Sequence, residues 1–179
     1  MAVDYFDFYE IPKNFYIDEG ALKSKFLIKS KQFHPDFFVN DDEKYADAME
    51  QTSLNNQAFK VLSKFNSRLE YILKSHGLLK ESKNEIPQDF LAEMMDINEV
   101  IMDLQFDCDQ EKVKQVKSDT QSISTNLDSQ IKSLTLQFDQ LEMDSSNEGE
   151  VILDQIKNIY LKQKYVLRLQ ESLDKFAPL

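Results

Sequence analysis

The tripeptide His34-Pro35-Asp36 separates two segments in which apolar residues recur at three- and four-residue steps. Such steps predict helices with one buried face, here over residues 18–33 and 41–64. Pro35 lacks an amide hydrogen and disfavours helical backbone at His34, so the chain breaks between the two segments. The sequence predicts two antiparallel helices joined by a short, solvent-facing loop that carries the tripeptide. The face predicted to be buried on the second helix consists of Ala48, Met49, Thr52, Asn55, Phe59 and Leu62.

Composition predicts the same class of fold for the whole chain. The 179 residues include only three Gly and four Pro, too few for the turns of a sheet protein. Hydrophobic residues make up 41% and charged residues 30% of the chain, which allows a buried core and excludes a disordered chain. We therefore expect an all-α protein with long helices.

Charge and cysteine content exclude several kinds of function. The 32 acidic and 21 basic residues give a net charge of −11, which repels nucleic acid and anionic membranes. Cys108 is the single cysteine, so an internal disulfide and a cysteine-based zinc site are excluded, and we expect no cofactor or metal. Apolar runs are short and residues 1–20 are acidic, so no transmembrane, signal or transit segment is expected. The chain is predicted to be soluble and cytoplasmic, of bacterial type, or a mature form already trimmed.

Charge also divides the chain into two parts. Residues 1–76 hold 12 acids and 10 bases, whereas residues 77–179 hold 20 acids and 11 bases. Gly77 is suited to end a helix and Pro87 to open the next one, so residues 77–87 are predicted to be a linker. The remaining part, residues 88–179, reads as three helices over about 88–106, 110–141 and 150–176. An antiparallel three-helix bundle is favoured, and a long coiled-coil hairpin is the alternative.

The first part carries a longer pattern around the tripeptide. A Tyr5-Phe6 start is followed by the tripeptide and then by Asn55-x-x-Ala58-Phe59-x-x-Leu62, Arg68 and Tyr71. Over residues 1–76 this pattern resembles the J-domain. J-domains stimulate ATP hydrolysis by DnaK-type chaperones, so the resemblance implies a co-chaperone. No Ser or Cys nucleophile accompanies the two histidines, so the chain is expected not to be an enzyme itself.

The resemblance implies that the tripeptide and a basic helix face bind the chaperone. Asp36 is a carboxylate suited to pairing with an arginine, Pro35 restricts the loop, and His34 can supply hydrogen bonds. The basic residues assigned to this contact are Lys25, Lys29 and Lys31. A lysine-rich helix face that is merely solvated is the alternative.

An unbroken acidic stripe marks the second part of the chain. Between Glu85 and Glu111 there are nine acids and no bases. Seven of them follow one another at steps of three or four residues and form the stripe: Glu85, Asp89, Glu93, Asp96, Glu99, Asp103 and Asp107. At about 100° per residue, the stripe lies opposite a predicted core face that includes Phe90, Met94, Ile97, Ile101 and Leu104. Leu91, Met95, Met102 and Phe106 lie between these two faces. Because an apolar shoulder beside repelling carboxylates suits a basic partner, we expect docking there, with a solvated face as the alternative.

The whole chain then resembles the HscB family of iron–sulfur co-chaperones. The segment Phe90-Leu91-Ala92-Glu93-Met94-Met95-Asp96-Ile97-Asn98-Glu99 is similar to the family's scaffold-binding helix. The resemblance implies that this surface binds an IscU-type iron–sulfur scaffold and that the partner chaperone is of DnaK or HscA type. The residues assigned to the scaffold contact are Leu91, Ala92, Met95, Asp96, Glu99, Asp103 and Tyr160.

The interpretation is therefore a co-chaperone that stimulates a chaperone ATPase and delivers the scaffold to it, which aids cluster transfer and protein maturation. The first alternative is a J-domain protein for another client, with a solvated acidic helix. The second is a hydrolase that uses His34 and Asp36. It is disfavoured because the sequence offers no Gly-rich loop, nucleophile or metal-ligand set.

Overall fold

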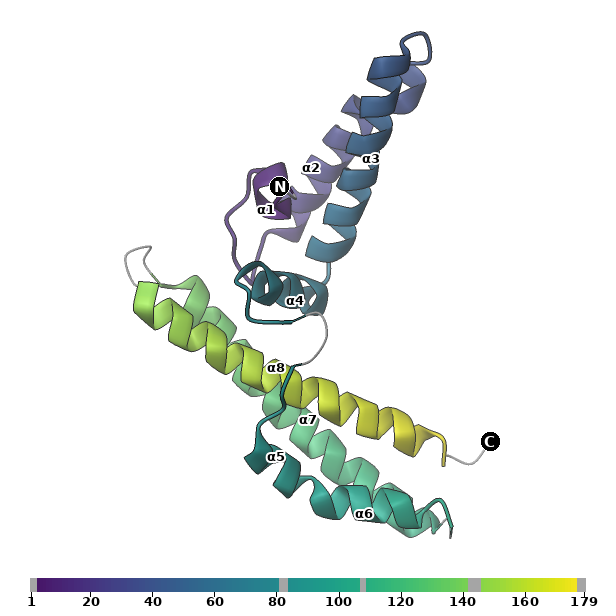
Figure 1. Cartoon of the computed structure of the whole chain (residues 1–179), viewed down its shortest axis with the longest axis vertical. Coiled ribbons are helices and arrows are strands. Elements are labelled where there is room, and N and C mark those ends of the chain that lie inside the picture. The colour runs from purple at the N-terminus through teal and green to yellow at the C-terminus, as the bar shows by residue number, and fades with distance from the viewer. Residues whose placement is uncertain (1–2, 81–83, 107–108, 142–145, 177–179) are drawn as a thin grey trace. The chain divides into compact units, whose positions relative to one another are not determined.

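The computed structural model describes residues 3–80, 84–106, 109–141 and 146–176 (Figure 1). Within these ranges the regular secondary structure is helical throughout, which confirms the all-α class. The chain divides into two compact units, residues 1–76 and 77–179. Cys108, which the sequence indicated to be no metal ligand, lies outside the described residues.

The first unit is built around two antiparallel helices, α2 (Glu19–Gln32) and α3 (Asp42–Leu62). Each begins at an aspartate, where the Asp18 and Asp41 carboxylates accept hydrogen bonds from the amides of Ala21 and Lys44 at 2.9 and 3.1 Å. The short helices of this unit are α1 (Tyr5–Tyr9), the 3-10 turn η1 (Pro35–Phe37) and α4 (Phe65–Ser75). Figure 1 shows the α2–α3 hairpin projecting beyond α1 and α4, with its tip at the far end.

The hydrogen bonds of the Asn55 side chain explain why the sequence pattern on α3 begins with an asparagine. Its side chain is 1% exposed. The Asn55 amide donates to the Phe26 carbonyl at 3.1 Å and to the Ser30 hydroxyl at 2.9 Å, both on α2. The Tyr9 hydroxyl of α1 donates to the Asn55 side-chain oxygen at 2.7 Å. One buried amide therefore joins three helices, because each of its polar atoms has a partner.

The apolar members of the pattern close the same core. Ala58 and Leu62 are fully buried, and the rings of Phe26 and Phe59 stack with centroids 4.2 Å apart. Met49 was predicted to share this face, but its side chain is 50% exposed. It follows Ala48, so it lies about 100° around the helix from the buried stripe. The prediction for Met49 was wrong because the buried stripe is narrower than the apolar pattern.

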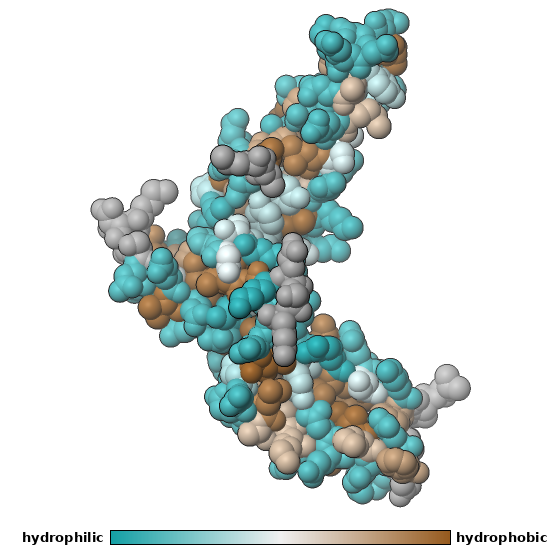
Figure 2. All heavy atoms as spheres, in the orientation of Figure 1, coloured by the Kyte–Doolittle hydropathy of each residue, from teal (hydrophilic) through white to brown (hydrophobic). Residues whose placement is uncertain are grey.

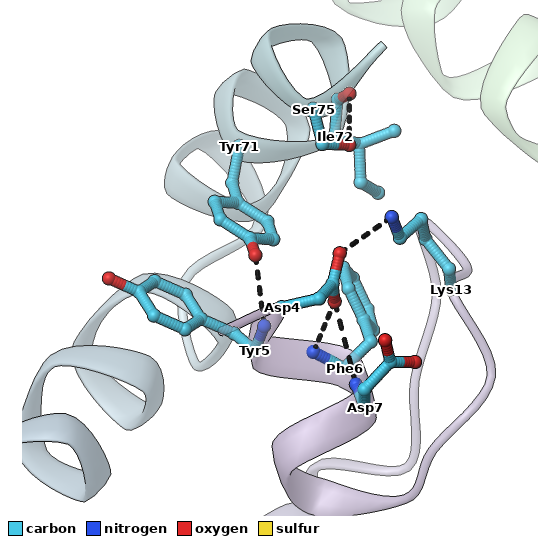
Figure 3. A network of polar contacts seen from close by, with 8 residues as sticks. All are labelled: Asp4, Tyr5, Phe6, Asp7, Lys13, Tyr71, Ile72 and Ser75. Atoms are coloured by element: carbon cyan, nitrogen blue, oxygen red, sulfur yellow. Dashed lines mark hydrogen bonds and ion pairs between the residues drawn. The ribbon is translucent and has the colours of Figure 1, made fainter. Parts of the chain in front are cut away.

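Further side-chain contacts connect the elements of this unit. Arg68 is buried, and its guanidinium donates to the Phe15 carbonyl at 2.8 Å and to the Leu62 carbonyl. At the N-terminal end, the Asp4 carboxylate caps α1 and pairs with Lys13 at 2.7 Å (Figure 3). The Tyr71 hydroxyl of α4 accepts a hydrogen bond from the Tyr5 amide at 2.9 Å, and the two rings stack.

The second unit contains α5 (Gln88–Glu93), α6 (Met95–Asp103), α7 (Gln110–Asp139) and α8 (Ser146–Asp174). The single helix predicted over residues 88–106 is thus two helices, with a turn at Met94. The Asn98 side-chain amide donates to the Met94 carbonyl at 2.7 Å and to the Tyr165 hydroxyl of α8 at 2.7 Å. These bonds anchor the turn to α8, a tertiary contact that the periodicity could not reveal.

The bundle forms at one end of this unit. Side chains of α5 and α6 pack with α7 and α8 in a core of Phe90, Met94, Ile101, Leu104, Val113, Val116, Leu127, Val166, Leu169 and Leu173. At 1.5 Å per residue, α7 is about 45 Å long and α6 only about 14 Å. Beyond the reach of α5 and α6, α7 and α8 continue as a two-helix hairpin with Ile131, Ile152 and Ile156 buried. The predicted bundle is thus present where α5 and α6 pack against α7 and α8, and the alternative, the hairpin, describes the remaining part of α7 and α8.

No helix in the described ranges is long and apolar enough to cross a membrane. The cytoplasmic location stays a prediction.

Candidate functional site

The tripeptide lies at the tip of the α2–α3 hairpin. Pro35 opens the 3-10 turn η1, and the Phe37 and Phe38 amides donate back to the His34 and Pro35 carbonyls at 3.1 and 2.9 Å. The hydroxyl of Thr52 on α3 donates to the carbonyl of Phe33 at 2.8 Å, one residue before the tripeptide. The tip is therefore a short hydrogen-bonded turn, tied to α3 on one side, and not an open loop.

The chemistry of the tip is that of an exposed acceptor. The Asp36 side chain is 82% exposed. The His34 Nδ1 atom accepts a hydrogen bond from the Asp36 amide at 3.3 Å. The same Nδ1 atom lies 3.6 Å from the Asp36 carboxylate. His34 thus organises the turn, and the Asp36 carboxylate faces solvent.

The three lysines assigned to the chaperone contact do not share one face. Lys25 and Lys29 lie about 40° apart around α2, whereas Lys31 lies about 160° from Lys29. The Lys29 ammonium lies 4.4 Å from the centroid of the Phe8 ring and 5.8 Å from that of Phe33, so it packs within the unit. Only Lys31 of the three is exposed.

The exposed face of α2 contains apolar residues that sequence reasoning missed. Leu27 is 56% and Ile28 is 65% exposed, and they lie with Lys23 on the side of α2 that carries Lys31. Phe37, directly after the tripeptide, is 66% exposed. The spacing of the lysines predicted a basic face, but the exposed face of this helix contains both basic and apolar residues.

The acidic stripe and its apolar shoulder are exposed, as the helical arithmetic predicted. Asp96, Glu99 and Asp103 are exposed on α6, and Ala92 is exposed on α5. Leu91 is 39% and Met95 is 60% exposed, while the core face below them is buried or partly buried. Asp107, the last carboxylate of the stripe, lies outside the described residues. Figure 2 shows apolar and polar atoms side by side over this part of the second unit.

Tyr160 does not join this exposed face. Its side chain is only 8% exposed on α8, and the Lys164 ammonium lies 5.6 Å from its ring centroid. On the same helix, the Tyr165 ring meets the Phe90 ring of α5 edge-on, and the Lys162 ammonium lies 5.0 Å from the Phe90 centroid. Sequence reasoning missed both of these residues, because periodicity within one helix does not say which of its residues face another.

Among the described residues, no group of three or more His, Cys, Asp or Glu side chains is placed to hold a metal ion. The exposed features are instead two surfaces on two helical units, one at a rigid turn and one along a helix.

Comparisons with known proteins identify the family of this chain. The family described as "HSCB C-terminal oligomerisation domain" matches residues 86–174. A Co-chaperone protein HscB homolog of Psychromonas ingrahamii is 31% identical over 175 residues, which cover 96% of this chain and 95% of that protein. An Iron-sulfur cluster co-chaperone protein HscB homolog of Arabidopsis thaliana is 32% identical over 122 residues, or 67% of this chain and 47% of that protein.

A solved structure agrees with these matches along the chain. The crystal structure of human co-chaperone protein HscB is 25% identical, with a TM-score of 0.64 over 99% of this chain and 84% of that one. The protein is thus an all-α co-chaperone of the kind that carries a J-domain. It belongs to the HscB family, whose members are co-chaperones in iron–sulfur cluster assembly and are not enzymes.

Proposed function

We propose that this chain stimulates the ATPase of a DnaK- or HscA-type chaperone through its first unit and delivers an IscU-type iron–sulfur scaffold on its second. The observation that carries the proposal is the Asp36 carboxylate, 82% exposed on a hydrogen-bonded turn. A carboxylate presented in this way can pair with an arginine of the partner, bidentate if the geometry permits.

The construction of the tip supports this role. Pro35 and the back-bonded amides of Phe37 and Phe38 restrict the turn before any partner arrives. Little conformational entropy is then lost on binding, which favours a specific contact at a small surface. The exposed Leu27 and Ile28 beside Lys31 offer apolar area on the adjoining helix.

The second surface supports a different partner. Exposed Leu91 and Met95 stand among Asp96, Glu99 and Asp103, which suits a partner that presents apolar side chains within a basic surround. With both surfaces on one chain, the scaffold is held at a high effective concentration near the chaperone. The chain thereby presents a client to an ATPase without performing chemistry itself.

The first test is the Asp36→Asn variant of the full chain in a steady-state ATPase assay with a purified DnaK- or HscA-type chaperone. We expect stimulation to be lost, and stability to change by less than about 0.5 kcal/mol because the side chain is at the surface. Asp47→Asn, an exposed carboxylate on α3, is the matched control and should stimulate normally. Normal stimulation by Asp36→Asn would contradict the assignment.

Salt dependence tests the basic helix. If Lys25, Lys29 and Lys31 meet an acidic partner, association with the chaperone should slow as ionic strength rises, since the screening length is about 10 Å at 0.1 M. The packing of Lys29 against Phe8 suggests that Lys31→Gln affects this rate more than Lys29→Gln. Salt-independent association would instead support the alternative that these lysines form a solvated helix face and do not bind the chaperone.

The scaffold contact is tested by replacing Leu91 and Met95 together with Ser. Binding of a purified IscU-type scaffold should weaken sharply, because apolar anchors carry about 1–3 kcal/mol each in such interfaces. Neutralising Glu99 and Asp103 should mainly lower the association rate. Circular dichroism should show the variants folded, since these side chains lie outside the core. Normal scaffold binding would favour the alternative of a J-domain protein for another client.

A further inference from the structure

We infer that the scaffold-docking surface extends along α6 beyond the residues matched to the family, to Met102 and Phe106. The inference rests on the proposed function and adds two side chains to its second surface. They are 62% and 91% exposed, the largest exposed fractions among the large apolar residues described in the second unit.

The exposure of Phe106 is built into the fold. Leu104, two residues earlier, is 1% exposed in the core. The Gln105 and Phe106 amides donate to the Met102 and Asp103 carbonyls at 3.1 and 2.9 Å, so the chain leaves α6 in a tightened turn. The backbone is therefore held, and the ring is turned outward although the core lies close by. Transfer of an exposed aromatic ring from water to an apolar partner surface is favourable, because a large apolar area is removed from water.

The new residues continue the proposed surface without a gap. Around α6, Met102 lies about 20° from Met95, two turns away, and Glu99 lies between them along the helix. Residues three apart eclipse in a tightened turn, so Phe106 stands over Asp103. Apolar and acidic side chains thus alternate along one face, from Met95 through Glu99, Met102 and Asp103 to Phe106.

The turn at Met94 moves the centre of this surface. Leu91 belongs to α5, on the other side of that turn, and is only 39% exposed. The three strongly exposed apolar residues lie on α6 and just after it, among carboxylates with no base between Glu85 and Glu111. The partner that binds here is therefore the scaffold itself, and the scaffold surface that makes the contact is apolar and surrounded by lysine or arginine.

The test is an isothermal titration of the full chain with a purified IscU-type scaffold. Phe106→Ser should weaken binding about tenfold and Met102→Ser by somewhat less, as expected for exposed apolar anchors of different size. Leu167→Ser and Val151→Ser, which remove exposed apolar residues of α8, are matched controls and should bind like the original chain. All four variants should stay folded by circular dichroism, because each side chain is at the surface.

A measurement on the unaltered chain gives a second readout. Hydrogen exchange of residues 95–106 should slow when the scaffold is added. If Leu91→Ser with Met95→Ser weakens binding but Met102→Ser with Phe106→Ser does not, the extension is wrong and the proposed function stands. If neither pair matters, the proposed scaffold surface itself fails. If Phe106→Ser instead dissociates a self-associated form of the chain at unchanged scaffold affinity, the occupant is a second copy and the inference is overturned.

Discussion

The interactions that stabilise the first unit differ in kind from those that stabilise the second. In the first, buried polar side chains connect elements far apart in sequence: Asn55 joins α3 to α1 and α2, and Arg68 binds the Phe15 carbonyl. In the second, the buried Thr120 and Thr135 bond carbonyls of their own helix, and apolar side chains form the seam. A fold with buried polar joints restricts which residues fit, whereas an apolar seam accepts many side chains of suitable size.

The difference predicts how each unit fails. Leu173 is 0% exposed and belongs to the bundle core of the second unit. Leu173→Ala should lower the free energy of unfolding of that unit by about 3 kcal/mol, because the cavity adds to the lost apolar burial. Leu167→Ala, half exposed on the same helix, is the control and should cost far less. Hydrogen exchange read by mass spectrometry would locate the loss, and loss of protection in α2 and α3 would contradict independent units.

Asn55→Ala should produce the corresponding loss in the first unit. Removing the amide deletes its bonds to Phe26 and Ser30 and one of the two bonds of the Tyr9 hydroxyl, at a cost of about 2 kcal/mol. Asn56→Ala changes the exposed neighbour and should be close to neutral. Urea unfolding monitored by circular dichroism, with the same exchange experiment, would measure both. Equal effects of the two variants would show that the polar joint does not stabilise the unit.

Thr135→Val should be much milder, although Thr135 is as buried as Asn55. Its hydroxyl bonds the Ile131 carbonyl at 2.7 Å in its own helix, and that carbonyl belongs to the helical ladder. The variant leaves no group without a partner, so the change should stay within about 0.5 kcal/mol. Thr125→Val makes the same change at an exposed site and controls for helix propensity. A loss as large as that of Asn55→Ala would remove the contrast between the units.

The smallest expected effect is the loss, at low pH, of the stabilisation that the Asp4 carboxylate gives the first unit. Partial burial alone would raise the pKa of the Asp4 carboxyl, but Lys13 and the amides of Phe6 and Asp7 together lower it (Figure 3). Because the folded pKa lies below the unfolded value of about 3.9, the stabilisation is complete above that pH and is lost as pH falls through the folded pKa. Asp4→Asn should therefore melt earlier than the original chain near neutrality, and the gap should close below about pH 4. A gap that persists in acid would show that the effect does not depend on ionisation of the Asp4 carboxyl; Asp7→Asn is the exposed control.

Much of the fold could be predicted because its signals are local. Pro35 breaks the helix whatever residues surround it. Asp18 and Asp41 can cap only the helix that begins directly after them. Periodicity identifies Phe90, Ile101 and Leu104 as core residues. The same arithmetic correctly placed Leu91 and Met95 outside the core. Met49 was wrong because periodicity does not say how wide a face the neighbouring helix covers.

Sequence alone determined the all-α class, the break at the tripeptide and the resemblance to the HscB family, since these depend on single residues and their spacing. Tertiary structure decided which residues of one helix meet another: the burial of Tyr160, the contact of Tyr165 with Asn98, and the packing of Lys29 on Phe8. It also decided that α5 and α6 separate at Met94 and that Phe106 points to solvent. The physical reason is that helix periodicity is a property of one segment, whereas burial depends on which surfaces of other segments lie against it.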